Sequence, residues 1–336
     1  MATTSTNPPR HQPWRKRIAL GGLALLLGAI LVLGLKPSHT TSQLADTIQT
    51  CGHFAFFGLL AVLTAVCLPA VVPNWRRHAA RSYAAGFAFS VLIGSTLEGL
   101  QALTPTRTPS WDDLIQDAFG ALAGVSLLAL VDRATPDRGM PRRLLIAALP
   151  TFLVMLVLGG LPLGLCLLDY YQRNQAFPQL HVFNDAWSGR FLWKDESVEV
   201  TPSAPPAGWP GDAGHDIADV LIPVGEKYPG VGFSEPVPNW NGYDAFAFDC
   251  LNAGDAVTMA MRIHDFAHND DMNDRYNRVL EIAPGFQTIR IAITEIQTAP
   301  RNRHLDITSI EGFKLFALKP TQPLHLYLGN FRLEKR

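Results

Sequence analysis

Polar side chains lie inside or beside long apolar segments in the first half of the chain. In chain order they are His53, Glu98, Gln101, Arg107, Ser110, Asp113 and Asp117. A histidine and carboxylates can exchange protons, and an arginine binds anionic groups. Polar groups are costly in lipid and often mark functional sites in membrane proteins. These residue types favour binding of a charged or hydroxylated ligand, with His53 or Glu98 as general base if a reaction occurs.

A second set of candidate residues lies in the other half: Trp240, Tyr243, His264, Arg275 and Tyr276. Aromatic rings present an apolar face with a polar edge, and Arg and His side chains can bond hydroxyl groups. The set therefore fits sugar binding. A structural interpretation stays open beside it. Trp240 and Tyr243 fit core residues at a strand entrance, and His264 fits a turn cap. Arg275 fits an ion-pair partner of Asp265 or Asp249.

The elements that must position the first set are apolar runs long enough for membrane spans. A span takes about 20 mostly apolar residues. Five runs qualify, at residues 18–35, 53–72, 83–103, 114–131 and 144–168. A cleaved signal peptide is the alternative for the first run, and it would leave four spans. We predict an all-α transmembrane bundle of about five helices.

Basic residues alternate between the loops that join these runs. They gather in the tail 1–17, in the loop after the second run (Arg76, Arg77, Arg81) and in the loop after the fourth, whereas the other two loops hold only Lys36 and Arg107. Because cytoplasmic loops carry the excess of Lys and Arg, the N-terminus is predicted to be cytoplasmic. The protein would then be a multi-pass protein of the plasma (inner) membrane. Its second half would be periplasmic or extracellular, on the same side as the polar set.

Residues 18–133 resemble the VanZ-like family, as a four-helix membrane domain. The pattern E-x2-Q-x5-R-x2-S-x2-D-x3-D runs from Glu98 to Asp117, and His53 precedes an aromatic run. Gln49 and Thr50 stand where the family usually has Asp-Lys, and Asp117 stands where Asn is common. The resemblance implies a membrane protein linked to cell-envelope or glycopeptide phenotypes, without an established reaction.

A structural interpretation of the same residues also stays open. Glu98, Arg107 and Asp113 would then form a charge network that joins helix ends. Gly120 and Gly124 form a small-xxx-small pair, which favours close helix packing.

The second half has short alternating runs separated by turns, which are typical of a β-sandwich or jelly roll. The clearest runs begin at Ala245, Val257, Thr288 and Leu324. We predict a fifth helix at 144–168, a linker at 169–181 and an extracytoplasmic all-β jelly-roll sandwich at 182–336. Residues 202–214 are rich in Pro and Gly and are predicted to form a loop.

Five elements of the predicted sandwich follow in order: Trp240-Asn-Gly-Tyr243, Arg262-Ile-His264-Asp265, Asp274-Arg-Tyr-Asn277, Pro284-Gly285 and Tyr327-Leu-Gly-Asn330. In this order the sandwich resembles the galactose-binding-like jelly rolls of the family 11 carbohydrate-binding-module type. The resemblance implies glycan binding and, in many members, a structural calcium. Gly329-Asn330 stands where an Asp-Asn pair is usual, so a structural calcium is possible but not expected. No other metal and no cofactor are predicted.

Composition narrows the function classes further. The net charge is -1, and the four cysteines (Cys51, Cys67, Cys166, Cys250) form no disulfide framework or metal set. Basic residues sit at membrane edges, which argues against nucleic-acid partners. We predict a VanZ-like envelope protein that binds a glycan or cell-wall precursor, a lipid headgroup or a protein partner on the outer side. A membrane enzyme acting on a lipid-linked or glycan substrate and a scaffold for a protein complex stay open, and no catalytic residue is assigned.

Overall fold

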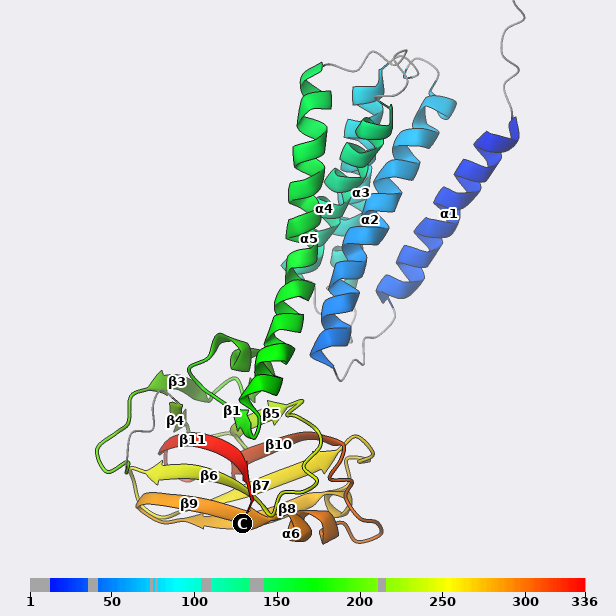
Figure 1. The fold of residues 1–336 in the computed structure, drawn as a ribbon. Coiled ribbons are helices and arrows are strands. Elements are labelled where there is room, and N and C mark those ends of the chain that lie inside the picture. The colour runs from blue at the N-terminus through cyan, green and yellow to red at the C-terminus, as the bar shows by residue number, and fades with distance from the viewer. Residues whose placement is uncertain are drawn as a thin grey trace, which may run out of the picture. The chain divides into compact units, whose positions relative to one another are not determined.

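The computed structural model describes residues 13–35, 42–72, 75, 78–103, 110–132, 142–210 and 216–335. The chain divides into two compact units, Met1–Cys166 and Leu167–Arg336. The first unit is helical and the second is built mainly of strands (Figure 1). The predicted fold class, an apolar helical segment followed by a β-sandwich, is confirmed.

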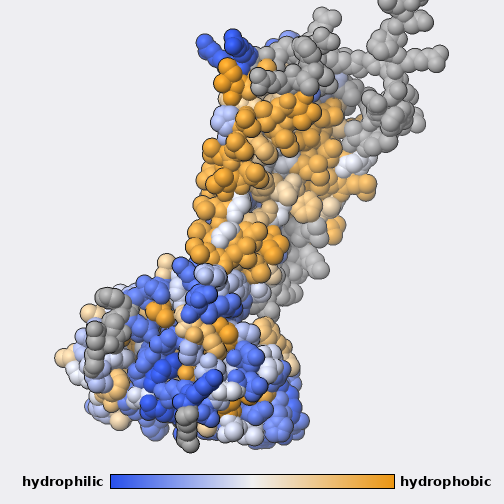
Figure 2. Space-filling model, viewed as in Figure 1, coloured by the Kyte–Doolittle hydropathy of each residue, from blue (hydrophilic) through white to orange (hydrophobic). Residues whose placement is uncertain are grey.

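Five long helices occupy the first half of the chain: α1 (Pro13–Leu35), α2 (Gln43–Val71), α3 (Ala79–Gln101), α4 (Trp111–Asp132) and α5 (Arg142–Ala176). Among the described residues, α2 to α5 are the four helices long and apolar enough to cross a membrane, and α1 has a shorter apolar stretch, Leu20–Ile30. Apolar residues cover most of the coloured surface of the helical unit that is visible in Figure 2. Exposed leucines such as Leu153 and Leu161 on α5 fit a lipid environment.

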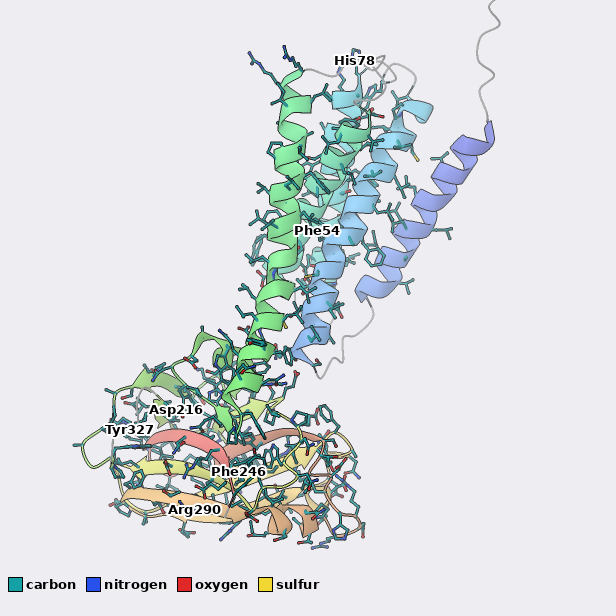
Figure 3. The ribbon with its side chains drawn as sticks, in the orientation of Figure 1. Phe54, His78, Asp216, Phe246, Arg290 and Tyr327 are labelled. Atoms are coloured by element: carbon teal, nitrogen blue, oxygen red, sulfur yellow. The ribbon has the colours of Figure 1, made fainter. Side chains whose placement is uncertain are left out.

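Glycines set the spacing of α2 and α4. A Cβ atom added to Gly120 would lie 2.0 Å from the carbonyl oxygen of Phe54, and one added to Gly124 would lie 2.3 Å from that of Gly58. The backbones therefore touch without intervening side chains, as the small-xxx-small pair predicts. The ring of Phe54 lies close to Gly159 of α5 (Figure 3).

Two helix boundaries differ from the predicted spans. The structure begins α2 at Gln43, so His53 lies about three turns inside the helix rather than at its start. The polar residues before His53 break the apolar run without breaking the helix. At the other boundary, α5 continues to Ala176 through most of the predicted linker. Its last turns are held within the second unit, where Arg190 donates to Asp169 at 2.6 Å and Arg173 donates to the carbonyl of Glu235 at 2.6 Å.

The strand unit contains two antiparallel sheets. The six-stranded sheet has the order β3-β4-β11-β6-β9, with β1 also paired to β11. The five-stranded sheet has the order β2-β5-β10-β7-β8. The bounds are β1 (Gln179–His181), β2 (Leu192–Lys194), β3 (Glu199–Ser203), β4 (Ile217–Ile222), β5 (Gly230–Ser234), β6 (Ala245–Asn252), β7 (Val257–Asp265), β8 (Tyr276–Ile282), β9 (Gly285–Ala292), β10 (Ile310–Ala317) and β11 (Leu324–Glu334). A short helix, α6 (Ile293–Thr298), follows β9.

The sequence assigned Pro202 to a loop, whereas the structure places it in β3. This strand lies at the edge of its sheet, where a proline can be tolerated because no neighbouring strand needs its missing N–H.

The core between the sheets is rich in aromatic rings. Phe313 and Phe331 lie within ring-contact distance of each other, and each also contacts Phe233 and Phe246; all four are buried. Inward residues alternate with outward ones along each strand, so the core and the outer faces are both fixed by strand register. The label of Phe246 in Figure 3 marks this interior.

Asn330 bridges three strands at an irregularity in β11, with a φ of 54°. Its backbone N–H donates to Asp216 at 3.1 Å, and its side-chain NH2 donates to Asp249 at 2.7 Å. Its side-chain oxygen accepts from Gln179 at 2.9 Å. The polar atoms near the expected Asp-Asn position therefore bond one another.

Candidate functional sites

The polar set of the first unit meets at His53. Nδ1 of His53 lies 2.9 Å from Oδ1 of Asp117, and Nε2 lies 3.8 Å from Oδ2 of Asp113. Asp113 and Asp117 are one turn apart on α4 and so share a face of that helix. The His53 ring also stacks on Phe57, with 5.9 Å between ring centroids. A histidine held between two carboxylates is a proton-exchanging group.

Glu98 and Ser110 extend this set. The backbone N–H of Ser110 donates to Glu98 at 2.7 Å, and the Ser110 hydroxyl accepts from the N–H of Asp113 at 3.3 Å. Gln101 is buried one turn after Glu98. The structure thus brings together five of the predicted residues through contacts, namely His53, Glu98, Ser110, Asp113 and Asp117. Arg107 lies outside the described residues.

Asp117 is the most deeply buried member, with none of its surface exposed. Its Oδ2 atom has no hydrogen-bond partner among the described residues and lies against Gly94, where an added Cβ would approach it to 2.2 Å. Oε1 of the neighbouring Gln116 is also buried without a partner. Buried acceptors without partners are rare and call for a donor. The set is therefore arranged to accept hydrogen bonds.

The outer face of the five-stranded sheet carries a row of residues from every strand. Register pairs Trp193 with Gly232, Gly232 with Lys314, Lys314 with Arg262, and Arg262 with Asn277. Directly paired residues share a face, so all five point outward together. Four strand spacings give the row a length of about 19 Å. We call this set the platform row.

Gly232 leaves space for the Trp193 ring in the platform row. A Cβ added to Gly232 would lie 3.0 Å from the ring of Trp193, so the absence of a side chain lets the indole approach the sheet. The Lys314 ammonium lies 3.9 Å from the Trp193 ring centroid, and the tryptophan keeps 46% of its surface exposed. Burial lowers the pKa of both Lys314 and Arg262 from their usual values. The row therefore combines an exposed aromatic with cationic hydrogen-bond donors.

A histidine pair adjoins the platform row. The rings of His264 and His268 lie 4.4 Å apart by centroid, and Nδ1 of His268 lies 3.2 Å from Oε2 of Glu311. His264 is paired with Gly312 in the register of β7 and β10. Burial, followed by the charge of Arg262, lowers the pKa of His264 to about 3, so this ring is neutral at neutral pH.

The other predicted sugar-binding residues lie elsewhere. Trp240 is 0% exposed and stacks on Phe246, and its indole N–H donates to the carbonyl of Val237. Tyr276 is buried with its hydroxyl on Glu295. Neither ring has a face open to a ligand, so Trp240 fits the core interpretation and Tyr276 is a core residue as well.

Tyr243 and Arg275 also lie apart from the platform row. Tyr243 packs edge-on against Phe177. Arg275 donates to the carbonyl of Asp270 near the histidine pair, rather than pairing with Asp265 or Asp249.

Sequence reasoning missed Trp193, Lys314, His268 and Glu311. The parity of β7 was an available signal, since Met259, Met261 and Ile263 point inward and Arg262 and His264 therefore point outward. No local feature of the sequence predicts that β2, β7 and β10 share one sheet, because the pairings that join them connect distant parts of the chain.

Residues 10–132 match the model of the VanZ/LLP1 family. This match confirms the resemblance predicted for the helical unit, over about the same residues. No curated protein sequence matches the chain significantly.

Solved structures similar to the chain align over less than half of it. The family 11 carbohydrate-binding module from Clostridium thermocellum, solved with a mixed-linked tetrasaccharide, is 15% identical, covers 43% of this chain and 87% of its own, and has a TM-score of 0.33. A carbohydrate-binding module specific for non-crystalline cellulose is 10% identical, covers 48% of this chain and 95% of its own, with a TM-score of 0.33. The agarase AgWH50C is 17% identical over 47% of this chain, with a TM-score of 0.36, and only 26% of that enzyme is spanned.

Proposed function

We propose that this protein is a multi-pass protein of the cell envelope that binds a glycan through the platform row of its β-sandwich. The observation that carries the proposal is the row itself. It places the half-exposed Trp193 and the donors Lys314, Arg262 and Asn277 on one face. Aromatic faces stack on the apolar faces of sugar rings, and charged donors make strong hydrogen bonds to hydroxyl groups.

The length of the row favours an oligosaccharide over a single sugar. A row of about 19 Å extends across all five strands. Its polar donors lie on one side of the tryptophan, so a chain of sugars would stack at Trp193 and bond toward Asn277. Wall glycan and polysaccharides at the membrane surface are the oligosaccharide ligands that a membrane-attached domain would encounter.

The glycan test uses the full chain in detergent on an array of envelope and plant-type oligosaccharides. Trp193→Ala should abolish binding, and Lys314→Ala should weaken it by about tenfold if one charged hydrogen bond is lost. Trp209→Ala is the matched control, since Trp209 is also a partly exposed tryptophan but packs on Phe286 of the six-stranded sheet. Equal binding by wild type and the Trp193 variant would refute the platform row. A defined protein partner with no glycan binding would favour a scaffold.

The proposed topology puts the N-terminus in the cytoplasm and the β-sandwich on the opposite side of the plasma membrane. Its support is the alternation of basic loops described above. A Val279→Cys variant tests it, because Val279 is 58% exposed. A membrane-impermeant maleimide applied to intact cells, or to spheroplasts where an outer membrane is present, should label this variant. Labelling only after lysis would reverse the proposed orientation.

The polar set of the helical unit supports a second candidate function, binding of a lipid-linked or headgroup ligand. The observation is the pair of buried acceptors without partners, Oδ2 of Asp117 and Oε1 of Gln116. They suit a ligand that donates hydrogen bonds, such as an ammonium or a hydroxylated headgroup. Native mass spectrometry of lipids retained by the detergent-purified protein tests this function. Asp117→Asn should lose a lipid that the control Asp112→Asn retains, since Asp112 is exposed. Identical lipid profiles would leave the set a structural network.

A further inference from the structure

Three potential metal ligands converge beside the platform row. His264 comes from β7, His268 from the turn that follows it, and Glu311 from β10. One ligand atom from each lies within 4.8 Å of the other two. Oε2 of Glu311 is 3.2 Å from Nδ1 of His268 and 3.9 Å from Nε2 of His264. We propose that His264, His268 and Glu311 bind a single zinc ion on the outer face of the five-stranded sheet.

The distances are close to those that zinc requires. Zinc holds imidazole nitrogen and carboxylate oxygen at about 2.0–2.2 Å, almost always as a tetrahedron. The edges of such a tetrahedron are about 3.3–3.5 Å. The separation of 3.2 Å lies near this value, the separation of 3.9 Å lies above it, and all three ligand atoms lie within 4.8 Å of one another. Two histidines and one carboxylate are also a ligand set that zinc uses with a fourth position open.

His264 lacks hydrogen bonds that would otherwise explain its position. Its Nδ1 atom is buried with no hydrogen-bond partner among the described residues. Its Nε2 is 3.9 Å from Glu311, beyond hydrogen-bond distance. No hydrogen bond from the described residues therefore competes with a metal for Nε2, the nitrogen that faces Glu311. Gly312 leaves room for the ring, since a Cβ there would lie 3.3 Å from the His264 Cε1 atom.

A second layer of contacts holds His268 in the orientation that ligation needs. Nε2 of His268 lies 3.3 Å from Oδ1 of Asp270, which is 85% exposed. With zinc on Nδ1, the proton of the neutral ring lies on Nε2 and is donated to this carboxylate. A carboxylate behind a ligating histidine is the usual outer-layer partner in zinc sites. Without the metal, Nδ1–H donates instead to the carbonyl of Asp265 at 2.8 Å.

The positive charge of Arg262 lies close to the proposed zinc position and should lower the affinity for zinc. Its Nη2 atom lies 3.4 Å from Nε2 of His268 and 3.5 Å from Asp270. A fixed positive charge so close to the ion lowers its affinity. Glu311 and Asp270 supply two negative charges that offset it. Removing the arginine charge should therefore tighten zinc binding at this site.

The experiment is zinc binding by the full chain in detergent, purified without a histidine tag and stripped with chelator. Zinc is titrated against a chromophoric competitor, and bound metal is counted by elemental analysis after dialysis. We expect one equivalent in the wild type. His268→Ala should lose it, Asp270→Asn should weaken it by about tenfold, and Arg262→Gln should strengthen it. His325→Ala is the matched control, because His325 forms a histidine–carboxylate pair with Asp219 on the other sheet.

Three outcomes decide the matter. One equivalent that disappears with His268→Ala and persists with His325→Ala supports the site. No zinc in the wild type, or zinc retained equally by the double variant His264→Ala/Glu311→Gln, overturns it. Amide exchange of β7 and β10 checks that the variants fold, and Glu311→Gln keeps the shape of the side chain. The readout contains no glycan, so failure of this site would leave the glycan proposal standing, and the reverse also holds.

Discussion

His181 should make the β-sandwich less stable in mild acid, because the unfolded chain binds a proton at this histidine and the folded chain does not. His181 is 1% exposed, and its ring contacts Phe183 and Phe233 with centroids 4.6 Å away. Its Nε2 atom has no hydrogen-bond partner among the described residues. Burial lowers the pKa of His181 to about 3, against 6.5 in an unfolded chain. The perturbation that isolates this effect is His181→Leu, an apolar side chain of similar size.

The sign follows from the two pKa values. Above about pH 6.5 the ring is neutral in both states and contributes no pH dependence. As the pH falls below 6.5, the unfolded chain binds a proton that the folded chain does not, so stability falls until the pH nears 3. The slope is about 1.4 kcal/mol per pH unit, which gives a loss of about 2 kcal/mol at pH 5.

Asp216 also makes the stability depend on pH. The difference in free energy of unfolding between wild type and His181→Leu is therefore more informative than the wild-type free energy alone. Burial raises the pKa of Asp216 to about 7, so this carboxyl destabilises the folded state as the pH rises above about 4. Asp216 therefore opposes His181 between about pH 4 and 6.5. Its contribution cancels when wild type and His181→Leu are compared at each pH.

The assay is pulse proteolysis in urea of the full chain in detergent, following the β-sandwich fragment at about pH 8 and pH 5. The free energy of unfolding of the variant relative to wild type should rise by about 2 kcal/mol between the two pH values. The packing cost of the substitution is the same at both pH values, so it does not affect the change in this difference with pH. A difference that does not change with pH would refute the assignment of a neutral buried His181.

Three further predictions follow from packing and burial. Gly124→Leu should disrupt the helical unit and lower its melting temperature in detergent, whereas Gly99→Leu, with no atom within 4 Å of an added Cβ, should not. Arg303→Ala should destabilise the sandwich by about 3–5 kcal/mol in urea, because it strips the 2.5 and 2.7 Å contacts from the fully buried Asp265; a cost below 1 kcal/mol would contradict this. Cys250, whose pKa burial raises to about 12, should react with maleimide only in denaturant, and labelling of the folded protein by mass spectrometry would contradict its burial.

The alternation of the sequence was enough to predict the strands that build the sandwich. The runs beginning at Ala245, Val257 and Leu324 became β6, β7 and β11. Their period of two is a local property, since inward and outward residues differ in type. The same rule, applied to β7, would have placed Arg262 and His264 on one outer face. It did not reach Trp193, because β2 has only three residues and shows no period.

The local sequence around Trp240 does not determine whether this residue lies in the core or in a binding loop. It lies in a turn, outside any alternating run, and its neighbours Asn241 and Gly242 are as suited to a binding loop as to a strand entrance. Only the loop's path decides, and that path depends on a hydrogen bond from the Trp240 N–H to the carbonyl of Ile307, far along the chain. The zinc ligands have the same character, since Glu311 joins the histidines through the pairing of β10 with β7. Long-range register cannot be read from one segment.

The helical unit shows why its structural and functional interpretations need not exclude each other. The spacing of Asp113 and Asp117 on one helix face was readable from the sequence. The 2.9 Å contact between Asp117 and His53 also requires that α2 and α4 lie unusually close. Gly120, one turn after Asp117, permits this approach because it touches the carbonyl of Phe54, the residue after His53. Any side chain at Gly120 would push the helices apart and pull the histidine away from its carboxylate. The glycines that pack the bundle are therefore the same residues that assemble its polar set.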